Sequence, residues 1–390
     1  MKSAPVCCTI ICNKFIKEIH YMKTLKKAIA ILLLLALCVP MLFSCASGLG
    51  NPVMTLGKTE VTENMLEFWL TRYKAYFVQY YMDGKDDPKF WNEKATGTDK
   101  TWNETFTEFI VDNAKTYTAS LYLFDDLGLK LPDSRIEAVD KEIADLLYGQ
   151  ADNNENQFNQ ILSTYGVNKE ILREIYIIEE KVAFLQDYLY GENGVEKLST
   201  TAKDDYYKEN YVRFQHIFRY TGSRPVIDDG EFVYGNDGYV KYEEMTKEED
   251  EKERKTMKAL FEDIKSGIQN FDEILSIYNQ DIANDEYPNG YYMTQTSTYV
   301  KEVIDAVFDM EVGEIRYVES DYGIHIIRRL SLIKGDYAKQ ENSDFFTDFE
   351  DNLITQTFNK KLEPYKKQIV VNEELVKKYC LRDVEANYTY

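Results

Sequence analysis

Apolar side chains recur at spacings of three and four residues through most of the first half of the chain. This is the period of a helix with one buried face. The first such helix is expected to start near Glu63, which lies in its first turn, and to end before Asp83-Gly84. No stretch of useful length alternates with period two, so we predict an all-helical lobe over residues 53–198. The other helices predicted in it span residues 102–127, 132–147, 158–166 and 167–190.

After Ser199 the pattern becomes mixed, because short segments rich in β-branched and aromatic residues alternate with segments of helical period. Such an order is typical of an α+β domain, which we place at residues 205–335. A hairpin is expected around Glu231–Tyr234, between two turns that contain glycine. The predicted strands are residues 211–220, 314–318 and 323–332, and the predicted helices are residues 247–268, 271–278 and 300–308.

A last amphipathic helix carries a wide apolar stripe that includes Phe349, Phe358 and Leu362. Fully burying a Phe or Leu side chain is worth about 1.5 to 3 kcal/mol, so this stripe is not expected to face water. Since the strand that ends near Leu332 should close the α+β domain, we expect residues 341–390 to pack on the helical lobe. The predicted fold class is therefore α+β, with a helical lobe built from both chain ends and an α+β domain inserted in it.

The amino end has the features of a secretory signal. A cationic stretch at residues 22–27 runs into an apolar segment that is shorter than the roughly 20 residues of a membrane-spanning helix. We assign residues 1–44 to the leader, with Met22 as an alternative start. The end of the segment, Leu42-Phe43-Ser44-Cys45, resembles the bacterial lipobox and implies lipid on Cys45, followed by a linker to residue 52. An ordinary signal peptide with a chance cysteine is the alternative.

Charge and cysteine usage exclude other classes. The 390-residue chain has a formal net charge of -21, which repels phosphate backbones, and no Lys/Arg stripe reverses the field locally, so no nucleic-acid partner is expected. Five of the six cysteines lie in the first 45 residues. The remaining thiol, Cys380, cannot form a disulfide framework or a zinc ribbon by itself.

Two histidines outside the leader, His216 and His325, lie on apolar predicted strands. Each alone is more often a hydrogen-bonded core residue than a reactive one. Their joint context changes this interpretation, because the surrounding segments resemble the parvulin family of peptidyl-prolyl isomerases over about residues 211–332. The segments that carry the resemblance are Gln215-His216-Ile217-Phe218, Tyr278-Asn279-Gln280-Asp281, Val312-Gly313-Glu314-Ile315 and Tyr322-Gly323-Ile324-His325-Ile326-Ile327.

The resemblance implies roles for particular residues. His216 and His325 match the paired histidines of the family, and Asp281 matches the acidic variant of its third catalytic position. The proline pocket departs from the family pattern, since the usual Met and Phe fall at Tyr299 and Val303. The usual Gly-Asp-Leu-Gly turn has become Asn289-Gly290-Tyr291-Tyr292. No cofactor or metal is implied. The residues assigned to substrate binding are Tyr291, Tyr292, Tyr299, Val303, Phe308 and Tyr322.

Together with the flanking helical lobe, the chain resembles SurA and PrsA type foldases. The main hypothesis is a lipid-anchored, extracytoplasmic isomerase and chaperone at the cell membrane, acting on unfolded or newly secreted polypeptides. The alternative is a catalytically weak holdase or binding lipoprotein with a degenerate parvulin domain. A solute-binding lipoprotein would need alternating strand and helix units that the pattern lacks. A zinc site from His216, Asp281 and His325 lacks an evident fourth ligand.

The lipidation hypothesis predicts the behaviour of one variant. Cys45→Ala removes the only thiol that the lipobox-like segment offers for acylation, so the protein should be released from membranes or remain unprocessed. Membrane fractionation and the mass of the amino-terminal peptide measure this. A Cys38→Ala variant is the matched control and should stay anchored. Membrane-bound, fully matured Cys45→Ala protein would contradict lipidation at this site.

Overall fold

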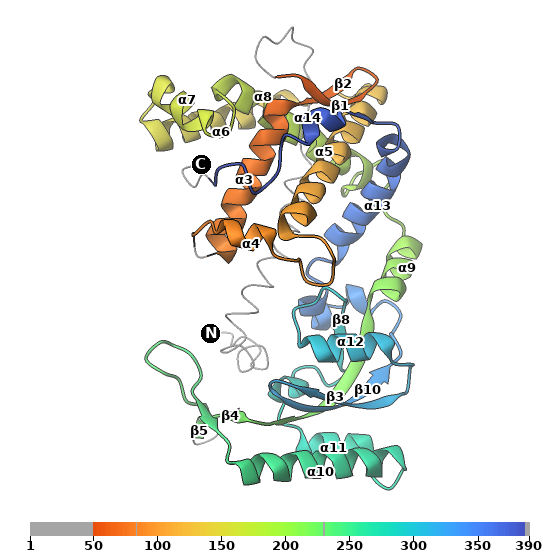
Figure 1. Ribbon diagram of the computed structural model, residues 1–390. Coiled ribbons are helices and arrows are strands. Elements are labelled where there is room, and N and C mark those ends of the chain that lie inside the picture. Colours follow the sequence, from red (N-terminus) through yellow and green to blue (C-terminus); the bar gives the residue numbers. More distant parts are fainter. Residues whose placement is uncertain (1–49, 83, 229–230, 387–390) are drawn as a thin grey trace. The chain divides into compact units, whose positions relative to one another are not determined.

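The computed structural model describes residues 50–82, 84–228 and 231–386, and it forms two compact units (Figure 1). One unit contains the described residues up to 198 together with those from 351 onward, and the other contains residues 199–350. The chain therefore leaves the first unit, builds the second, and returns to the first. Cys45 and the leader lie outside the described residues. No helix within the described ranges is long and apolar enough to cross a membrane.

The first unit is mainly helical, as predicted, but it is not all-helical. A small antiparallel sheet in the order β11-β1-β2 joins the two chain ends, and Met54 on β1 is opposite Val371 on β11. Strand β11 has two residues, too short for a hydrophobic period in the sequence to indicate it. The elements are β1 (Pro52–Leu56), β2 (Thr59–Thr62), α3 (Glu63–Tyr81), α4 (Pro88–Asn92), α5 (Trp102–Asp126), α6 (Asp133–Ala151), α7 (Glu155–Ser163), α8 (Lys169–Tyr190), the later part of α13 (Phe349–Lys366), β11 (Val370–Val371) and α14 (Glu373–Val376).

One hydrophobic core holds the helical unit together. It is rich in aromatic side chains from α3 and α5, such as Trp69, which stacks on Tyr117 with ring centroids 4.3 Å apart. The carboxyl-terminal segment contributes Phe358, Leu362 and Leu381, all with no exposed surface. The expectation that the apolar stripe of the last long helix is buried in this lobe therefore holds for its second half.

The second unit is built on a four-stranded antiparallel sheet in the order β8-β3-β10-β9. Helices α10 and α11 pack on one face, where Ile217, Ile324 and Ile326 meet them, and α12 packs on the other face. The elements are α9 (Thr200–Asn210), β3 (Val212–Tyr220), β4 (Ser223–Pro225), β5 (Ile227–Asp228), β6 (Glu231–Phe232), β7 (Tyr242–Glu244), α10 (Lys247–Lys265), α11 (Phe271–Tyr278), η1 (Ile282–Asp285), β8 (Tyr291–Met293), α12 (Lys301–Asp309), β9 (Ile315–Ser320), β10 (Gly323–Leu330), η2 (Asp336–Ala338) and η3 (Gln340–Phe345).

This unit extends further than the predicted range of 205–335. Helix α9 begins at Thr200, and residues 336–350 close an aromatic cluster beside the sheet. In that cluster Tyr337 stacks on Phe349 with ring centroids 4.7 Å apart, and Phe346 packs against Tyr211 with ring centroids 4.9 Å apart. Residues 341–350, which we expected on the helical lobe, thus belong to the α+β unit because their aromatic side chains find partners there.

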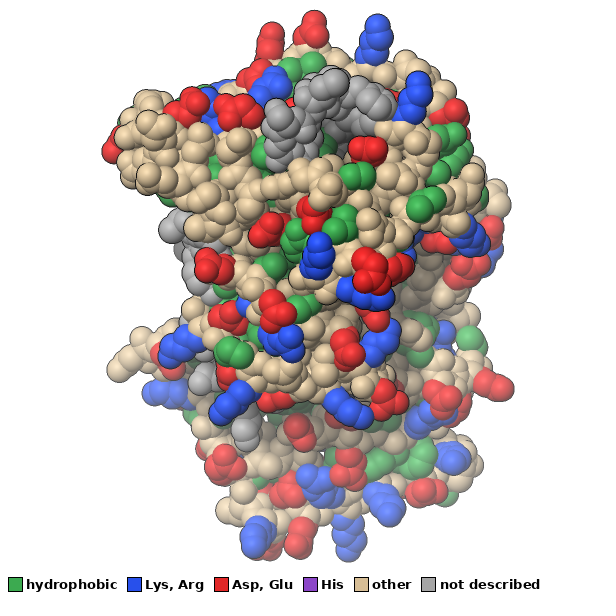
Figure 2. All heavy atoms as spheres, turned by 45° about the horizontal axis from the view of Figure 1, so that its top comes forward, with side chains coloured by type: hydrophobic (Ala, Val, Ile, Leu, Met, Phe, Trp, Pro, Cys, Tyr) green, Lys and Arg blue, Asp and Glu red, His purple; other side chains and the backbone are tan. Residues whose placement is uncertain are grey.

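Charged side chains of both signs are interspersed on the face drawn in Figure 2, and no continuous field of Lys and Arg is visible there. Many of the described ion pairs are short-range and exposed, such as Lys141 with Asp145 one helical turn away. Exposed pairs of this kind contribute little to stability.

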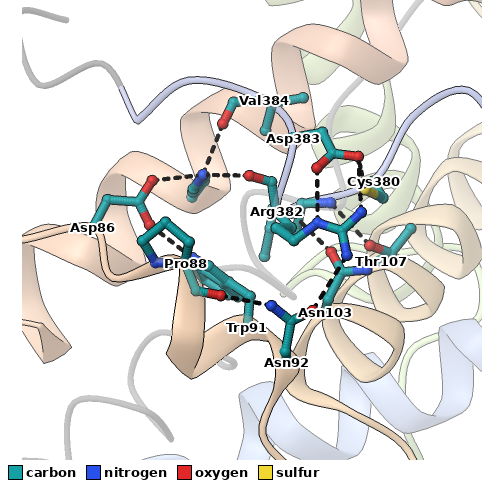
Figure 3. Close-up of polar contacts among 12 residues, drawn as sticks. Asp86, Pro88, Trp91, Asn92, Asn103, Thr107, Cys380, Arg382, Asp383 and Val384 are labelled. Atoms are coloured by element: carbon teal, nitrogen blue, oxygen red, sulfur yellow. Dashed lines mark hydrogen bonds and ion pairs between the residues drawn. The ribbon is translucent and has the colours of Figure 1, made fainter.

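A buried lysine ties the carboxyl-terminal segment to the helical unit. Figure 3 labels three of its partners, Asp86, Arg382 and Val384. Lys74 on α3 is 2% exposed, and its Nζ donates to the carbonyl oxygens of Arg382 at 2.9 Å and Val384 at 2.8 Å. The same ammonium pairs with Asp86 at 2.7 Å. A buried cation needs several acceptors, and two of these come from a segment about 300 residues away along the chain.

Removing this cation should destabilise the helical unit. Lys74→Met keeps the length of the side chain but leaves two carbonyl oxygens and Asp86 without their donor, so we expect the free energy of unfolding to fall by about 3 kcal/mol. Urea denaturation followed by circular dichroism measures it. Lys141→Met, on the exposed surface of α6, is the control and should change little. Equal stability of both variants would show that the buried lysine does not stabilise the fold.

Candidate functional site

Neighbouring strands bring the two histidines together inside the α+β unit. In the antiparallel register of β3 and β10, His216 is opposite Ile327 and His325 is opposite Phe218, which places both imidazoles on the same face of the sheet. Their Nδ1 atoms are 3.0 Å apart, and neither residue has exposed surface. The sequence predicted that these two residues act together, and the structure places them in direct contact.

Asp281 completes the group from the turn after α11. Its Oδ2 lies 2.7 Å from His216 Nε2, and its Oδ1 accepts the backbone N–H of Ala283 at 3.1 Å. Asn279 fixes this turn to the sheet, because its Oδ1 accepts the N–H groups of both Phe218 and Asp281. The carboxylate is therefore buried, hydrogen-bonded and held against β3.

Ser320 extends the group at its other end, and sequence reasoning missed it. Its Oγ lies 3.0 Å from His325 Nε2 and 3.1 Å from the carbonyl oxygen of Gly323. A serine at the end of a strand gives no signal in a single sequence. Only the turn between β9 and β10, which brings residue 320 opposite residue 323, reveals its role.

When Asp281 is ionised, one order of protons gives every hydrogen bond from Ser320 through the two histidines to Asp281 one donor and one acceptor. The carboxylate accepts from His216 Nε2–H, which leaves His216 Nδ1 as the acceptor for His325 Nδ1–H. His325 Nε2 is then an acceptor for the hydroxyl of Ser320. In this order both imidazoles are neutral.

The electrostatics favour a neutral His325. Complete burial and the neighbouring His216 hold the pKa of His325 well below its usual value of about 6.5, and the more distant Asp281 only partly opposes them. A neutral imidazole is a poor general acid at neutral pH. The pair is thus suited to fixing the shape and polarity of the site rather than to supplying a proton.

Two tyrosine hydroxyl groups join the site from positions where the resemblance implied apolar pocket residues. Tyr291 Oη donates to Asp281 Oδ2 at 2.7 Å, and Tyr299 Oη lies 3.5 Å from His216 Nε2. Tyr291 is buried, whereas Tyr299 is half-buried. The sequence predicted both residues as part of the site, but not that their hydroxyl groups would reach the catalytic candidates.

The other predicted substrate-binding residues are distributed differently. Phe308 and Tyr322 are half-buried on the hydrophobic cluster of the histidine face, and Val303 is fully buried within it. Tyr292 does not belong to this group. Because adjacent residues of a strand point to opposite faces, its side chain is on the other side of β8 from Tyr291, and its hydroxyl donates to Asp336.

No group of three or more His, Cys, Asp or Glu side chains among the described residues is arranged to hold a metal ion. In particular, the site combines two imidazoles that face each other through their Nδ1 atoms with one carboxylate. That arrangement directs the imidazole nitrogens at each other and at the carboxylate instead of at a shared central point.

Residues 233–331 match the protein-family model of the PPIC-type PPIASE domain. The matched segment contains Asp281 and His325, and the hydrogen bond between the imidazoles adds His216 from β3, which precedes the segment. The chain contains a parvulin-type peptidyl-prolyl isomerase domain. The comparison with curated proteins gave no match.

Several solved PrsA structures are similar to this chain at low identity. Peptidylprolyl isomerase PrsA from Bacillus cereus is 18% identical, with 85% of this chain and 97% of that chain covered and a TM-score of 0.30. PrsA from Bacillus subtilis is 17% identical over 75% and 93% of the two chains, with a TM-score of 0.22. Foldase PrsA from Streptococcus pneumoniae is 15% identical over 73% and 95%, also at 0.22. At scores this low, only the family match and the geometry above identify the parvulin-type domain.

The low pKa of His325 makes stability depend on pH. Below about pH 6.5 the unfolded chain protonates this residue while the folded domain keeps it neutral, so stability should fall with pH by up to about 1.4 kcal/mol per pH unit. His325→Gln should be less stable at pH 7.5, because His216 loses its partner, and should lose stability less steeply between pH 6.5 and 5.5. Thermal denaturation of the chain from residue 46, which has no other histidine than these two, measures both effects. If the stability of the unsubstituted protein and of His325→Gln fell equally steeply with pH, the low pKa assigned to His325 would be contradicted.

Proposed function

We propose that this protein is a foldase, in which the parvulin-type domain isomerises X-Pro bonds and the helical unit binds unfolded segments. The observation that carries the proposal is the buried chain of Ser320, His325, His216 and Asp281. All of these residues except His216 lie in the segment that matches the PPIC-type family. We assign the catalytic roles to His216, Asp281 and His325.

Isomerisation of an X-Pro bond requires few chemical groups in the site. Rotation about an amide has a barrier of about 18 to 20 kcal/mol, yet no covalent bond is formed or broken. A nucleophile is therefore unnecessary. An enzyme lowers this barrier by binding the twisted amide more tightly than the planar one, for which rigid polar groups beside an apolar contact surface are sufficient.

In the proposed binding mode the prolyl ring packs on the half-buried aromatic side chains next to the histidines. Tyr299, Phe308 and Tyr322 combine partial exposure with contact to the hydrophobic cluster of this face. Val303 supports them from within the core, and Tyr291 holds the carboxylate. Tyr292 is left out of the pocket because of its orientation.

We further propose an extracytoplasmic location at the cell membrane, with Cys45 as the lipid-modified residue. Support comes from the sequence of the leader, which combines a cationic start, a short apolar segment and a small residue before the cysteine. The clients would be unfolded or newly secreted polypeptides. A strongly acidic, anchored protein would be repelled from the anionic membrane surface and would present its domains to such clients.

A catalytically weak holdase is the second candidate. It is favoured by the phenol groups of Tyr291 and Tyr299, which make the surroundings of the histidines more polar than a purely apolar proline pocket. Aromatic side chains bind extended segments with little loss of rotamer freedom, so binding would survive even if isomerisation were slow.

A protease-coupled assay with a prolyl peptide distinguishes the isomerase from the catalytically weak holdase. The chain from residue 46 should accelerate cis-to-trans conversion, and Asp281→Asn should lower kcat/KM at least tenfold, or about 1.4 kcal/mol of barrier. Asp272→Asn is the matched control, since this aspartate near the start of α11 pairs with Arg328 on the other face of the sheet. The control should retain its activity.

The remaining outcomes separate the two candidates. Suppression of client aggregation without any acceleration of isomerisation would favour the holdase and overturn the enzyme proposal. Acceleration that is equally fast in Asp281→Asn would overturn the assigned roles but not the activity. Absence of both activities would exclude both candidates.

A further inference from the structure

Tyr291 places its hydroxyl on the carboxylate that ends the buried hydrogen-bond chain. The residue lies on β8 and is 5% exposed, and Oη donates to Asp281 Oδ2 over 2.7 Å. The centroid of its ring lies 5.5 Å from that of Phe214 and 5.6 Å from that of His216, whose ring is nearly perpendicular to it. Its hydroxyl is therefore directed at Asp281 Oδ2.

Asp281 meets titratable groups from every element around it. His216 faces it from β3 at 2.7 Å, Tyr291 from β8, and Tyr299 from the segment before α12, with His325 behind His216 on β10. The hydrogen bonds to this carboxylate from Tyr291 and from the backbone N–H of Ala283 come from uncharged donors, which stabilise its ionised form.

The geometry of the chain allows a second order of protons. If Asp281 is protonated, it can donate to His216 Nε2, which moves the proton of His216 to Nδ1 and makes His325 Nδ1 an acceptor. His325 Nε2–H then donates to Ser320 Oγ. In this order the hydroxyl of Ser320 no longer donates to His325 and donates instead to the carbonyl oxygen of Gly323, 3.1 Å away. The contacts of Ser320 Oγ with His325 Nε2 and with the carbonyl oxygen of Gly323 are therefore compatible with both orders.

We propose that Tyr291 is a positioning residue that keeps Asp281 ionised and thereby selects the first order of protons. This inference deepens the proposed function and rests on it. A hydrogen bond to the ionised form of a carboxyl lowers its pKa, so the phenol extends the ionised state to lower pH. Tyr291 acts on the substrate only through Asp281 and the histidines.

The experiment compares Tyr291→Phe with Tyr292→Phe. The second variant is a close control, because Tyr292 is the next residue of the same strand, is also buried, and also donates to a carboxylate, that of Asp336 on the other face. Both variants keep the aromatic ring and remove only a hydroxyl. The protein is the chain from residue 46, which includes every described residue, labelled with ¹⁵N-histidine and prepared without a histidine tag.

Nitrogen shifts of the two imidazoles report the order directly and do not require activity. At pH 7.5 the unsubstituted protein should show His216 protonated on Nε2 and His325 on Nδ1, with reversal on acidification. In Tyr291→Phe the midpoint of reversal should lie about one pH unit higher, which is about 1.4 kcal/mol, because a hydrogen bond to the ionised form is lost. The acid limb of kcat/KM should move with it, whereas Tyr292→Phe should leave both unchanged.

A double variant guards against indirect effects. In an Asp281→Asn background no carboxylate remains to be stabilised, so adding Tyr291→Phe should change neither the tautomers nor kcat/KM further. Unshifted midpoints in Tyr291→Phe, or equal shifts in both tyrosine variants, would overturn the proposal. Nitrogen shifts as expected in a protein without isomerase activity would overturn the proposed function and leave the role of Tyr291 intact.

Discussion

The hydrogen bond between His216 and His325 is the constraint on which the α+β unit depends. Both imidazoles are fully buried, and a buried ring nitrogen without a partner costs about 1 to 3 kcal/mol. Each ring therefore needs partners at both nitrogens. The register of β3 and β10 supplies the contact between them, and Asp281 and Ser320 occupy the two outer ends. A shift of either strand by one residue would turn an imidazole to the other face and break the whole chain.

This constraint also explains why the site is suited to conformational catalysis. A chain of fixed donors and acceptors in a dry setting keeps its polarity in place without reorganising around the substrate. It contains no activated nucleophile, and amide rotation needs none. The tyrosines at positions 291 and 299 add hydroxyl groups to this chain, so the same substitutions that make the surroundings more polar also tie them to the catalytic candidates.

The helical unit follows the same principle with a different group. The ammonium of Lys74 is buried and takes its acceptors from Asp86 and from backbone carbonyls near the carboxyl end of the chain. Together with the pairing of β1 and β11, this contact makes the last residues part of the first unit. An α+β unit between residues 199 and 350 is therefore an insertion in a unit that both chain ends complete.

The sequence by itself predicted the long helices of the first unit and the α+β class, because periodicity reports on neighbours along the chain. The resemblance of local segments to the parvulin family indicated His216, Asp281 and His325 as site candidates. Other features depended on contacts between distant segments. Tyr291 and Tyr292 look equivalent in the sequence, and only the pairing of β8 with β3 decides which one faces the histidines. Ser320 enters the site through the turn that brings it beside β10, and the aromatic residues at 345–349 join the α+β unit because their partners lie on α9 and β8. Strand register and side-chain packing are set by the whole fold, and a single sequence does not display them.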